Sequence, residues 1–213
     1  MNIEERVNKI VESEFRIPLI IVLATGVISG VVSWIVSSKI HYIWPENMPV
    51  GQYWGVIMAG STLISGIIVA VVTWVFLFGA IHIIARAFGG FGEVQRVLKV
   101  GGYIFLILLV GNIVSAIAVP FIPEMKMDLS YINEETPDIS EILDQTKEYQ
   151  TSTGYILYES IITIFKAVAM IFTILAAEAL YKVSRMKAII ACGIPYLVYI
   201  LIPIFTMLLT LSL

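Results

Sequence analysis

The sequence predicts an all-α integral membrane protein with five transmembrane helices, a cytoplasmic N-terminus, an outside C-terminus and an N-terminal interfacial amphipathic helix. Hydrophobic residues make up 59% of the 213 residues, against about 45–50% in ordinary globular proteins. Five apolar stretches each have the roughly 20 residues that a helix needs to cross a membrane. They are Ile17–Ser38, Val56–Ala85, Val100–Pro120, Tyr155–Leu180 and Ala188–Leu211. These runs lack the alternation of barrel strands, so only helices satisfy their backbone in lipid.

The basic residues predict how the chain is oriented. Nine Lys and Arg residues fall before the first stretch, after the second and after the fourth, whereas three fall on the opposite side. An excess of this kind marks the cytoplasmic side of a membrane protein. The nine bases face five acids outside the spans, a net charge of +4 that suits anionic lipid headgroups. Insertion topology alone also explains the excess, so lipid binding is a second interpretation.

Residues 1–16 are predicted to form a cytoplasmic amphipathic helix ahead of a single membrane domain over 17–213. Apolar residues recur at helical spacing on one face: Ile3, Val7, Ile10 and Phe15. Such a helix can lie in the plane of the inner headgroups. A binding site for a soluble protein partner is the alternative.

Small residues four positions apart mark the first two spans, a spacing that lets helix backbones approach closely. These candidate packing residues are Gly26, Gly30, Thr62, Gly66 and Ala70. Packing within the five-helix bundle is the expected use, and the seam of a homo-oligomer is the alternative.

The segment 121–154 is predicted to be an acidic outer loop, with eight Asp and Glu residues against two Lys. Within it, Thr136 and Pro137 have the chemistry of a helix start. An apolar stripe then follows: Ile139, Ile142, Leu143 and Tyr149. We expect an amphipathic helix of about three turns, resting on the bundle mouth or the membrane. The spacing of a calcium-binding loop is absent from this segment.

The sequence carries no zinc-protease, phosphate-loop or nucleophile-elbow motif. His41 and His82 fall at opposite membrane boundaries, and no histidine is placed beside the single Cys192. We therefore expect no catalytic residues, no metal site, no cofactor and no nucleic-acid partner. The sequence therefore predicts a protein that is not an enzyme.

Polar groups inside the spans are the candidate functional residues: Lys166, Glu159, Glu178, Arg86, His82 and Asn112. A charge at Lys166, near the middle of the fourth span, costs about 2.5–3.5 kcal/mol, so Lys166 must be neutral, paired or facing water. Glu159 lies on the same helix face about 10 Å away, since the rise is ~1.5 Å per residue. Arg86 is at a depth that allows it to neutralise Glu178. These groups are interpreted either as internal ties of the bundle or as a polar path.

The turn after the second span is the most distinctive local sequence. It contains Phe88-Gly-Gly-Phe-Gly-Glu93, and Gly101-Gly-Tyr103 follows at the start of the third span. Its notable residues are Gly89, Gly90, Gly92, Gly101, Gly102 and Tyr103. A short basic turn, Tyr181-Lys-Val-Ser-Arg-Met-Lys187, precedes a Pro-containing last span. In these features the chain resembles the Yip1 family, in particular its divergent prokaryotic branch.

The resemblance implies a cytoplasmic N-terminus, five spans and a role in membrane organisation or trafficking. For eukaryotic members it also implies contacts with prenylated small GTPases, and the eukaryotic hallmark Asp-Leu-Tyr-Gly-Pro is absent here. We expect a non-enzymatic membrane scaffold, located in the plasma membrane if the source is prokaryotic. Its expected partners are membrane lipids, anionic at the cytoplasmic face, a second copy of the chain, and a protein at the N-terminus. The alternative is a small-solute or ion transporter or channel with a polar path around Lys166.

Overall fold

The computed structural model describes residues 3–45, 53–129 and 140–212. Its helices are α1 (Ile3–Glu12), α2 (Arg16–Ser37), α3 (Trp54–Ala87), α4 (Val94–Ser115), the 3-10 helix η2 (Ala116–Phe121), α5 (Ser140–Thr151), α6 (Thr153–Tyr181) and α7 (Arg185–Ser212). The described residues also form two short strands, β1 (Ile40–Ile43) and β2 (Met125–Asp128). In the described chain, five helices are long and apolar enough to cross a membrane: α2, α3, α4 with η2, α6 and α7. The predicted five-helix architecture is confirmed.

Four of the spanning helices extend beyond the predicted apolar stretches at both ends, and α2 is displaced from its stretch by one residue. The largest difference is at α4, which begins at Val94 rather than at Val100. An apolar run measures only the part of a helix that lies in hydrocarbon, whereas backbone hydrogen bonds continue into the interface. At its other end, α4 tightens into η2, which contains Pro120.

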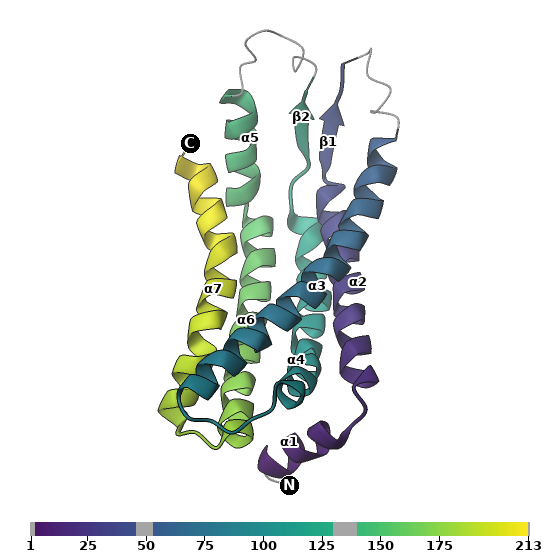
Figure 1. The fold of residues 1–213 in the computed structure, drawn as a ribbon. Coiled ribbons are helices and arrows are strands. Elements are labelled where there is room, and N and C mark those ends of the chain that lie inside the picture. The colour runs from purple at the N-terminus through teal and green to yellow at the C-terminus, as the bar shows by residue number, and fades with distance from the viewer. Residues whose placement is uncertain (1–2, 46–52, 130–139, 213) are drawn as a thin grey trace.

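The spanning helices run along one long axis, and α1 lies across one end of the bundle (Figure 1). The strands and α5 are at the opposite end. We call these the α1 end and the strand end. The N-terminus is at the α1 end, and α7 runs away from it, so the C-terminus points toward the strand end (Figure 1).

Helix α3 crosses the bundle obliquely (Figure 1). It lies beside α2 toward the strand end and reaches α7 at the α1 end, and it packs against both helices. Where α3 packs against α2, the backbones of the two helices touch directly. A Cβ atom added at Gly66 would lie 2.6 Å from the Gly26 carbonyl oxygen and 2.8 Å from the Gly30 Cα. The predicted small residues therefore face one another within one chain.

The glycine turn after α3 wraps around Tyr181, the last residue of α6. Gly89 has a φ of +85°, a conformation that glycine adopts without strain. A Cβ atom at Gly90 would lie 2.9 Å from the Tyr181 Cβ, and one at Gly92 would overlap the Tyr181 ring. The Phe91 amide donates to the Tyr181 carbonyl at 3.3 Å. The turn thus fixes the end of α3 to the end of α6.

Glycines at the start of α4 serve the same kind of close packing. A Cβ atom at Gly101 would lie 2.6 Å from the Phe78 ring, and one at Gly102 would overlap Pro18. Tyr103, the aromatic residue that follows, is half-buried and lies beside α1. The expected family-like turn is therefore a packing device at the α1 end.

The strand end contains a pairing that the sequence analysis does not predict. Strand β1 pairs in parallel with β2, Ile40 opposite Met125. Parallel strands need a long crossover, and α3 and α4 supply it here. The predicted outer-loop helix is present as α5, while its expected start at Thr136 and Pro137 lies outside the described residues. Tyr149 of α5 is buried and donates to the Val36 carbonyl at 3.3 Å; burial raises the pKa of Tyr149 to about 12.

Candidate functional site

All five spanning helices contribute to a cavity of about 290 Å³ in the half of the bundle toward the strand end. Its polar lining comes from Thr25 and Ser29 of α2, Thr73 of α3, Asn112 of α4, Tyr158, Glu159 and Lys166 of α6, and Tyr199 of α7. Its apolar lining includes Val69 and Phe105. A cavity of this size has room for several water molecules. The cavity is therefore a polar chamber within a bundle whose outer surface is apolar.

Helix α6 supplies the charged wall of the cavity. Its lining positions are Tyr158, Glu159, Ile162, Phe165 and Lys166. They repeat at the spacing of one helix face, so a regular helix presents them together. Three of the sequence-predicted residues, Lys166, Glu159 and Asn112, lie on this one cavity.

Lys166 is buried, with 8% of its surface exposed. Its Nζ atom lies over the Tyr199 ring, 4.6 Å from the ring centroid. From the sequence we expect a carbonyl, Asn112 or Glu159 as the contact, and Tyr199 takes that place because α7 packs against α6. Among the described residues, no carboxylate pairs with the Lys166 ammonium. The aromatic face attracts the cation but accepts no conventional hydrogen bond from it.

Glu159 and Lys166 are opposite charges in the same chamber. Glu159 is half-buried and lies closer to the strand end than Lys166. Helical side chains point back toward the helix N-terminus, so the Lys166 side chain extends in the direction of Glu159. Within the described structure the two side chains form no salt bridge, although they are close enough to interact electrostatically. Each charge therefore remains available to a polar occupant of the cavity.

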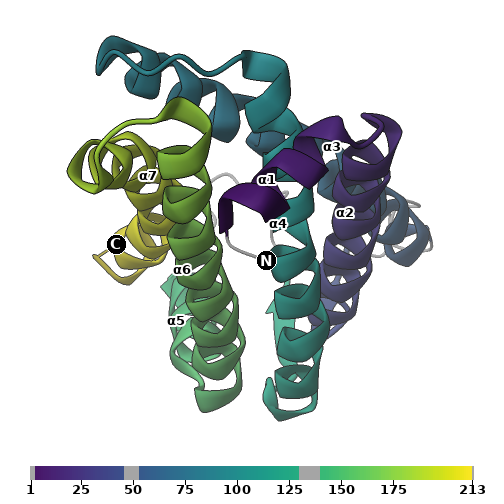
Figure 2. The same ribbon diagram turned by 90° about the horizontal axis from the view of Figure 1, so that it is seen from below.

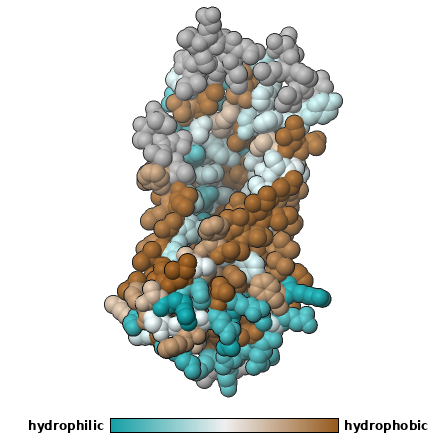
Figure 3. Space-filling model, in the orientation of Figure 1, coloured by the Kyte–Doolittle hydropathy of each residue, from teal (hydrophilic) through white to brown (hydrophobic). Residues whose placement is uncertain are grey.

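The surface of the bundle is hollowed in the same half. Figure 3 shows a depression between two apolar columns, with hydrophilic surface on its floor. The columns correspond to α3 and α7, which diverge toward the strand end (Figure 1). Val69 of α3 lines the cavity and is also 60% exposed on the apolar face of the bundle. The chamber therefore opens sideways, through a face that lipid tails would cover.

Three other predicted residues lie at the α1 end, away from the cavity. From their depths we expect Glu178 to pair with Arg86. Instead, Glu178 pairs with Arg185, at 3.2 Å between Oε2 and Nε. The chain turns sharply between α6 and α7 and brings Arg185 back to Glu178. The His82 Nδ1 atom is 2.8 Å from the Tyr181 hydroxyl, and Arg86 is exposed.

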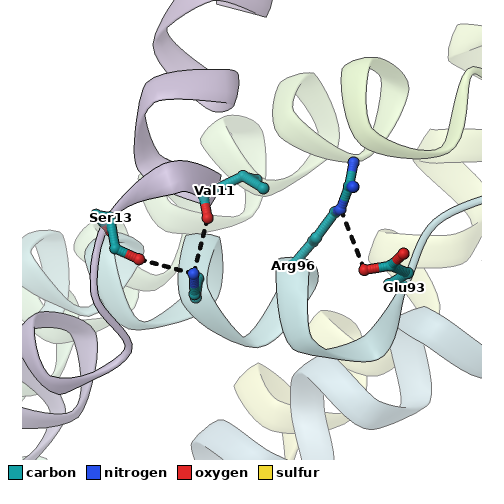
Figure 4. Close-up of polar contacts among 5 residues, drawn as sticks. Val11, Ser13, Glu93 and Arg96 are labelled. Atoms are coloured by element: carbon teal, nitrogen blue, oxygen red, sulfur yellow. Dashed lines mark hydrogen bonds and ion pairs between the residues drawn. The ribbon is translucent and has the colours of Figure 1, made fainter.

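Lys99 is a residue whose role the sequence analysis does not single out. Its ammonium donates to the carbonyls of Val11, at 2.8 Å, and Ser13, at 2.7 Å, just where α1 ends (Figure 4). The final carbonyls of a helix lack partners within the helix, and a cation there is favoured by the helix dipole. Lys99 thus caps α1 and holds it against α4. Only its position one turn inside α4 hints at this role in the sequence.

Tyr199 is the second residue that sequence reasoning missed. A signal for it exists, because Pro203 follows four residues later in the same span and also lines the cavity. A proline lacks the N–H that would pair with the carbonyl four residues earlier. The Tyr199 region is therefore a break in the regular bonding of α7, of the kind that often marks a site in a membrane helix.

In the described parts of the chain, no three His, Cys, Asp or Glu side chains are placed to hold a metal ion. The chain matches the family model described as the Yip1 domain over residues 4–207. It belongs to the Yip1 family. An uncharacterized protein of Methanocaldococcus jannaschii is 30% identical over 105 residues, which cover 49% of this chain and 72% of that relative. No solved structure matches the chain.

The match to the Yip1 domain confirms the resemblance drawn from the glycine turn and the basic turn before the last span. Together with the five apolar helices, it identifies an integral membrane protein.

Proposed function

We propose that this Yip1-family protein is a non-enzymatic scaffold that organises lipids, and proteins bound to them, at the cytoplasmic face of a membrane. The observation that carries the proposal is the placement of α1. It lies across the base of the bundle, between the ends of α4 and α6 (Figure 2). With the N-terminus in the cytoplasm, as the basic residues predict, the α1 end faces the cytoplasm.

The faces of α1 are used differently. Val7 is 5% exposed and packs against the bundle, whereas Arg6 and Lys9 are exposed. The hydrophilic surface at this end begins directly below the apolar belt (Figure 3). A cation at this level contributes about 1 kcal/mol to the binding of anionic lipid. Arg86 adds a further exposed cation from the end of α3.

The packing of the α1 half supports a scaffold rather than a channel. Its core contains large side chains that are fully buried, among them Phe78, Tyr181 and Tyr196. These residues do not line the cavity. A continuous polar path would need to pass through them.

Cysteine labelling tests the orientation. Single cysteines replace Ser140 and Ser184 in a Cys192→Ala background, because both positions are exposed and they lie at opposite ends of the bundle. We expect an impermeant thiol reagent to label Ser140→Cys from outside intact cells and Ser184→Cys only after permeabilisation. Labelling of both from one side contradicts the topology.

Lipid analysis tests the scaffold function. The protein is reconstituted in mixed phosphatidylcholine and phosphatidylglycerol, extracted in polymer-bounded particles, and its surrounding lipids are quantified by mass spectrometry. We expect phosphatidylglycerol to be enriched around the wild type. Replacement of Arg6, Lys9 and Arg86 by Gln should remove the enrichment. The matched control replaces the strand-end cations Lys39, Lys126 and Lys147 by Gln and should preserve it. Equal enrichment in both variants would refute lipid organisation by the α1 end.

A further inference from the structure

We propose that the cavity lined by the five spanning helices, which opens between α3 and α7, binds the zwitterionic headgroup of a phospholipid that enters sideways from the leaflet at the strand end. The phosphate would contact Lys166 and the terminal ammonium would contact Glu159. This site is separate from the basic surface at the α1 end, and its function does not depend on that surface.

The order of the two charges along the membrane normal matches one orientation of a lipid. Glu159 is nearer the strand end, and Lys166 lies about 10 Å deeper, at ~1.5 Å per residue. In an ethanolamine or choline lipid of that leaflet, the ammonium is outermost and the phosphate is closer to the acyl chains. Lys166 lies near the middle of α6, so the headgroup is drawn into the bundle from its leaflet. In that position the order of the two protein charges matches the order of the phosphate and the ammonium.

No salt bridge in the described structure neutralises Lys166, so a polar occupant would complete the site. Lys166 is buried and lines the cavity, and its Nζ atom lies over an aromatic ring rather than in a salt bridge. A buried charge in hydrocarbon is costly unless it is paired or hydrated. Water satisfies this need in part, whereas a phosphate oxygen supplies both the opposite charge and a charge-assisted hydrogen bond.

Neighbouring residues complete a site for a headgroup. Asn112 and the hydroxyl groups of Ser29 and Thr73 line the same space and can hydrogen-bond to phosphate or glycerol oxygens. Tyr158, next to Glu159 on α6, adds an aromatic side chain to the lining near the expected position of the ammonium group.

The shape of the opening favours a lipid over a free solute. The depression lies between apolar columns in the face that contacts hydrocarbon (Figure 3). A headgroup can enter there while its acyl chains remain outside, against exposed apolar residues such as Val69 and Ile68 of α3. A water-soluble zwitterion would have to leave water and cross that apolar rim. The headgroup is therefore expected to belong to a lipid rather than to a free zwitterion.

Native mass spectrometry of the full-length protein in detergent tests the site. Delipidated protein is titrated with phosphatidylethanolamine, phosphatidylglycerol or free phosphoethanolamine. We expect one phosphatidylethanolamine to be retained per chain, with phosphatidylglycerol, which lacks the ammonium, bound about tenfold less tightly. Free phosphoethanolamine should bind weakly, because it gains nothing from the apolar rim.

Variants assign the binding to the cavity. Lys166→Met and the near-isosteric Glu159→Gln should each reduce phosphatidylethanolamine retention by about tenfold or more. Lys126→Met, an exposed cation at the strand end, is the matched control and should retain the lipid. Glu159→Gln keeps the test decisive if Lys166→Met fails to fold. Retention that is unchanged in Glu159→Gln, or free phosphoethanolamine that binds as tightly as the lipid, would overturn the proposal.

Discussion

The two halves of this bundle are built in different ways. At the α1 end the helices meet around large buried side chains, and glycines bring backbone against ring, as at Gly92 and Tyr181. Toward the strand end the same helices surround a polar cavity of about 290 Å³ that holds Lys166 and Glu159. The centre of one half is filled by large side chains, whereas the other half contains a chamber.

The difference follows from the path of one helix. Because α3 is oblique, it closes against α7 at the α1 end and leaves α7 toward the strand end, where it packs on α2 (Figure 1). The glycine contact with α2 fixes that direction, since only backbones without side chains approach so closely. Gly66 also lines the cavity, so the close packing of α3 on α2 leaves the space beside α7 open in the same half.

The largest expected effect comes from removing the centre of the closed half. Tyr181→Ala should lower the free energy of unfolding by about 3–5 kcal/mol, because a large buried aromatic leaves a cavity. The Tyr181 side chain is fully buried and its hydroxyl meets His82 at 2.8 Å. Unfolding in mixed detergent micelles measures the change, with Tyr53→Ala, at an exposed position, as the control. A loss below about 1 kcal/mol would mean that the α1 half is not the stable core.

Disrupting the glycine contact between α3 and α2 should give the next largest loss of stability. Gly66→Leu should destabilise the bundle by about 1–3 kcal/mol, since the new side chain meets the backbone of Gly26 and Gly30. Gly60→Leu on the same helix is the matched control, because a Cβ atom there meets nothing within 4 Å. Equal midpoints for the two variants in the same unfolding assay would contradict the proposed role of this contact.

The attachment of α1 should depend on Lys99. In Lys99→Met, the carbonyls of Val11 and Ser13 lose their charged donor, which should weaken the docking of α1 by about 1.5–3 kcal/mol. Hydrogen exchange of the amides in α1 measures this local loss. Arg96→Met, one turn away, removes only an exposed ion pair with Glu93 and should change exchange little. Identical exchange in both variants would show that other contacts hold α1.

The smallest effect on stability is expected within the chamber. In detergent without phospholipid, Lys166→Met should change the free energy of unfolding by less than about 1 kcal/mol. The lost attraction to the Tyr199 ring is offset by the removal of a poorly paired buried charge. The same unfolding assay measures it. A loss above about 2 kcal/mol would make Lys166 a structural tie of the bundle.

Part of the chamber could be predicted from the sequence, and part could not. Lys166, Glu159 and Asn112 stand out because polar residues are rare in apolar spans, and all three line the cavity. Tyr199 does not stand out, because a tyrosine inside a span fits many environments and its role depends on how α7 packs against α6. The pairing of Glu178 was wrongly expected with Arg86, since depth along separate helices says nothing about the direction in which side chains turn.

The sequence alone determined that the chain has five helices long and apolar enough to cross a membrane, because hydrophobic length is a property of each segment by itself. It also determined the family, through the glycine turn that the Yip1 match includes. Only the tertiary structure decided that α3 lies obliquely, that β1 pairs with β2, and that charges from one face of α6 meet Tyr199 of α7. Lipid makes all apolar helix faces nearly equivalent, so close packing of small residues and a few polar contacts choose among the possible arrangements.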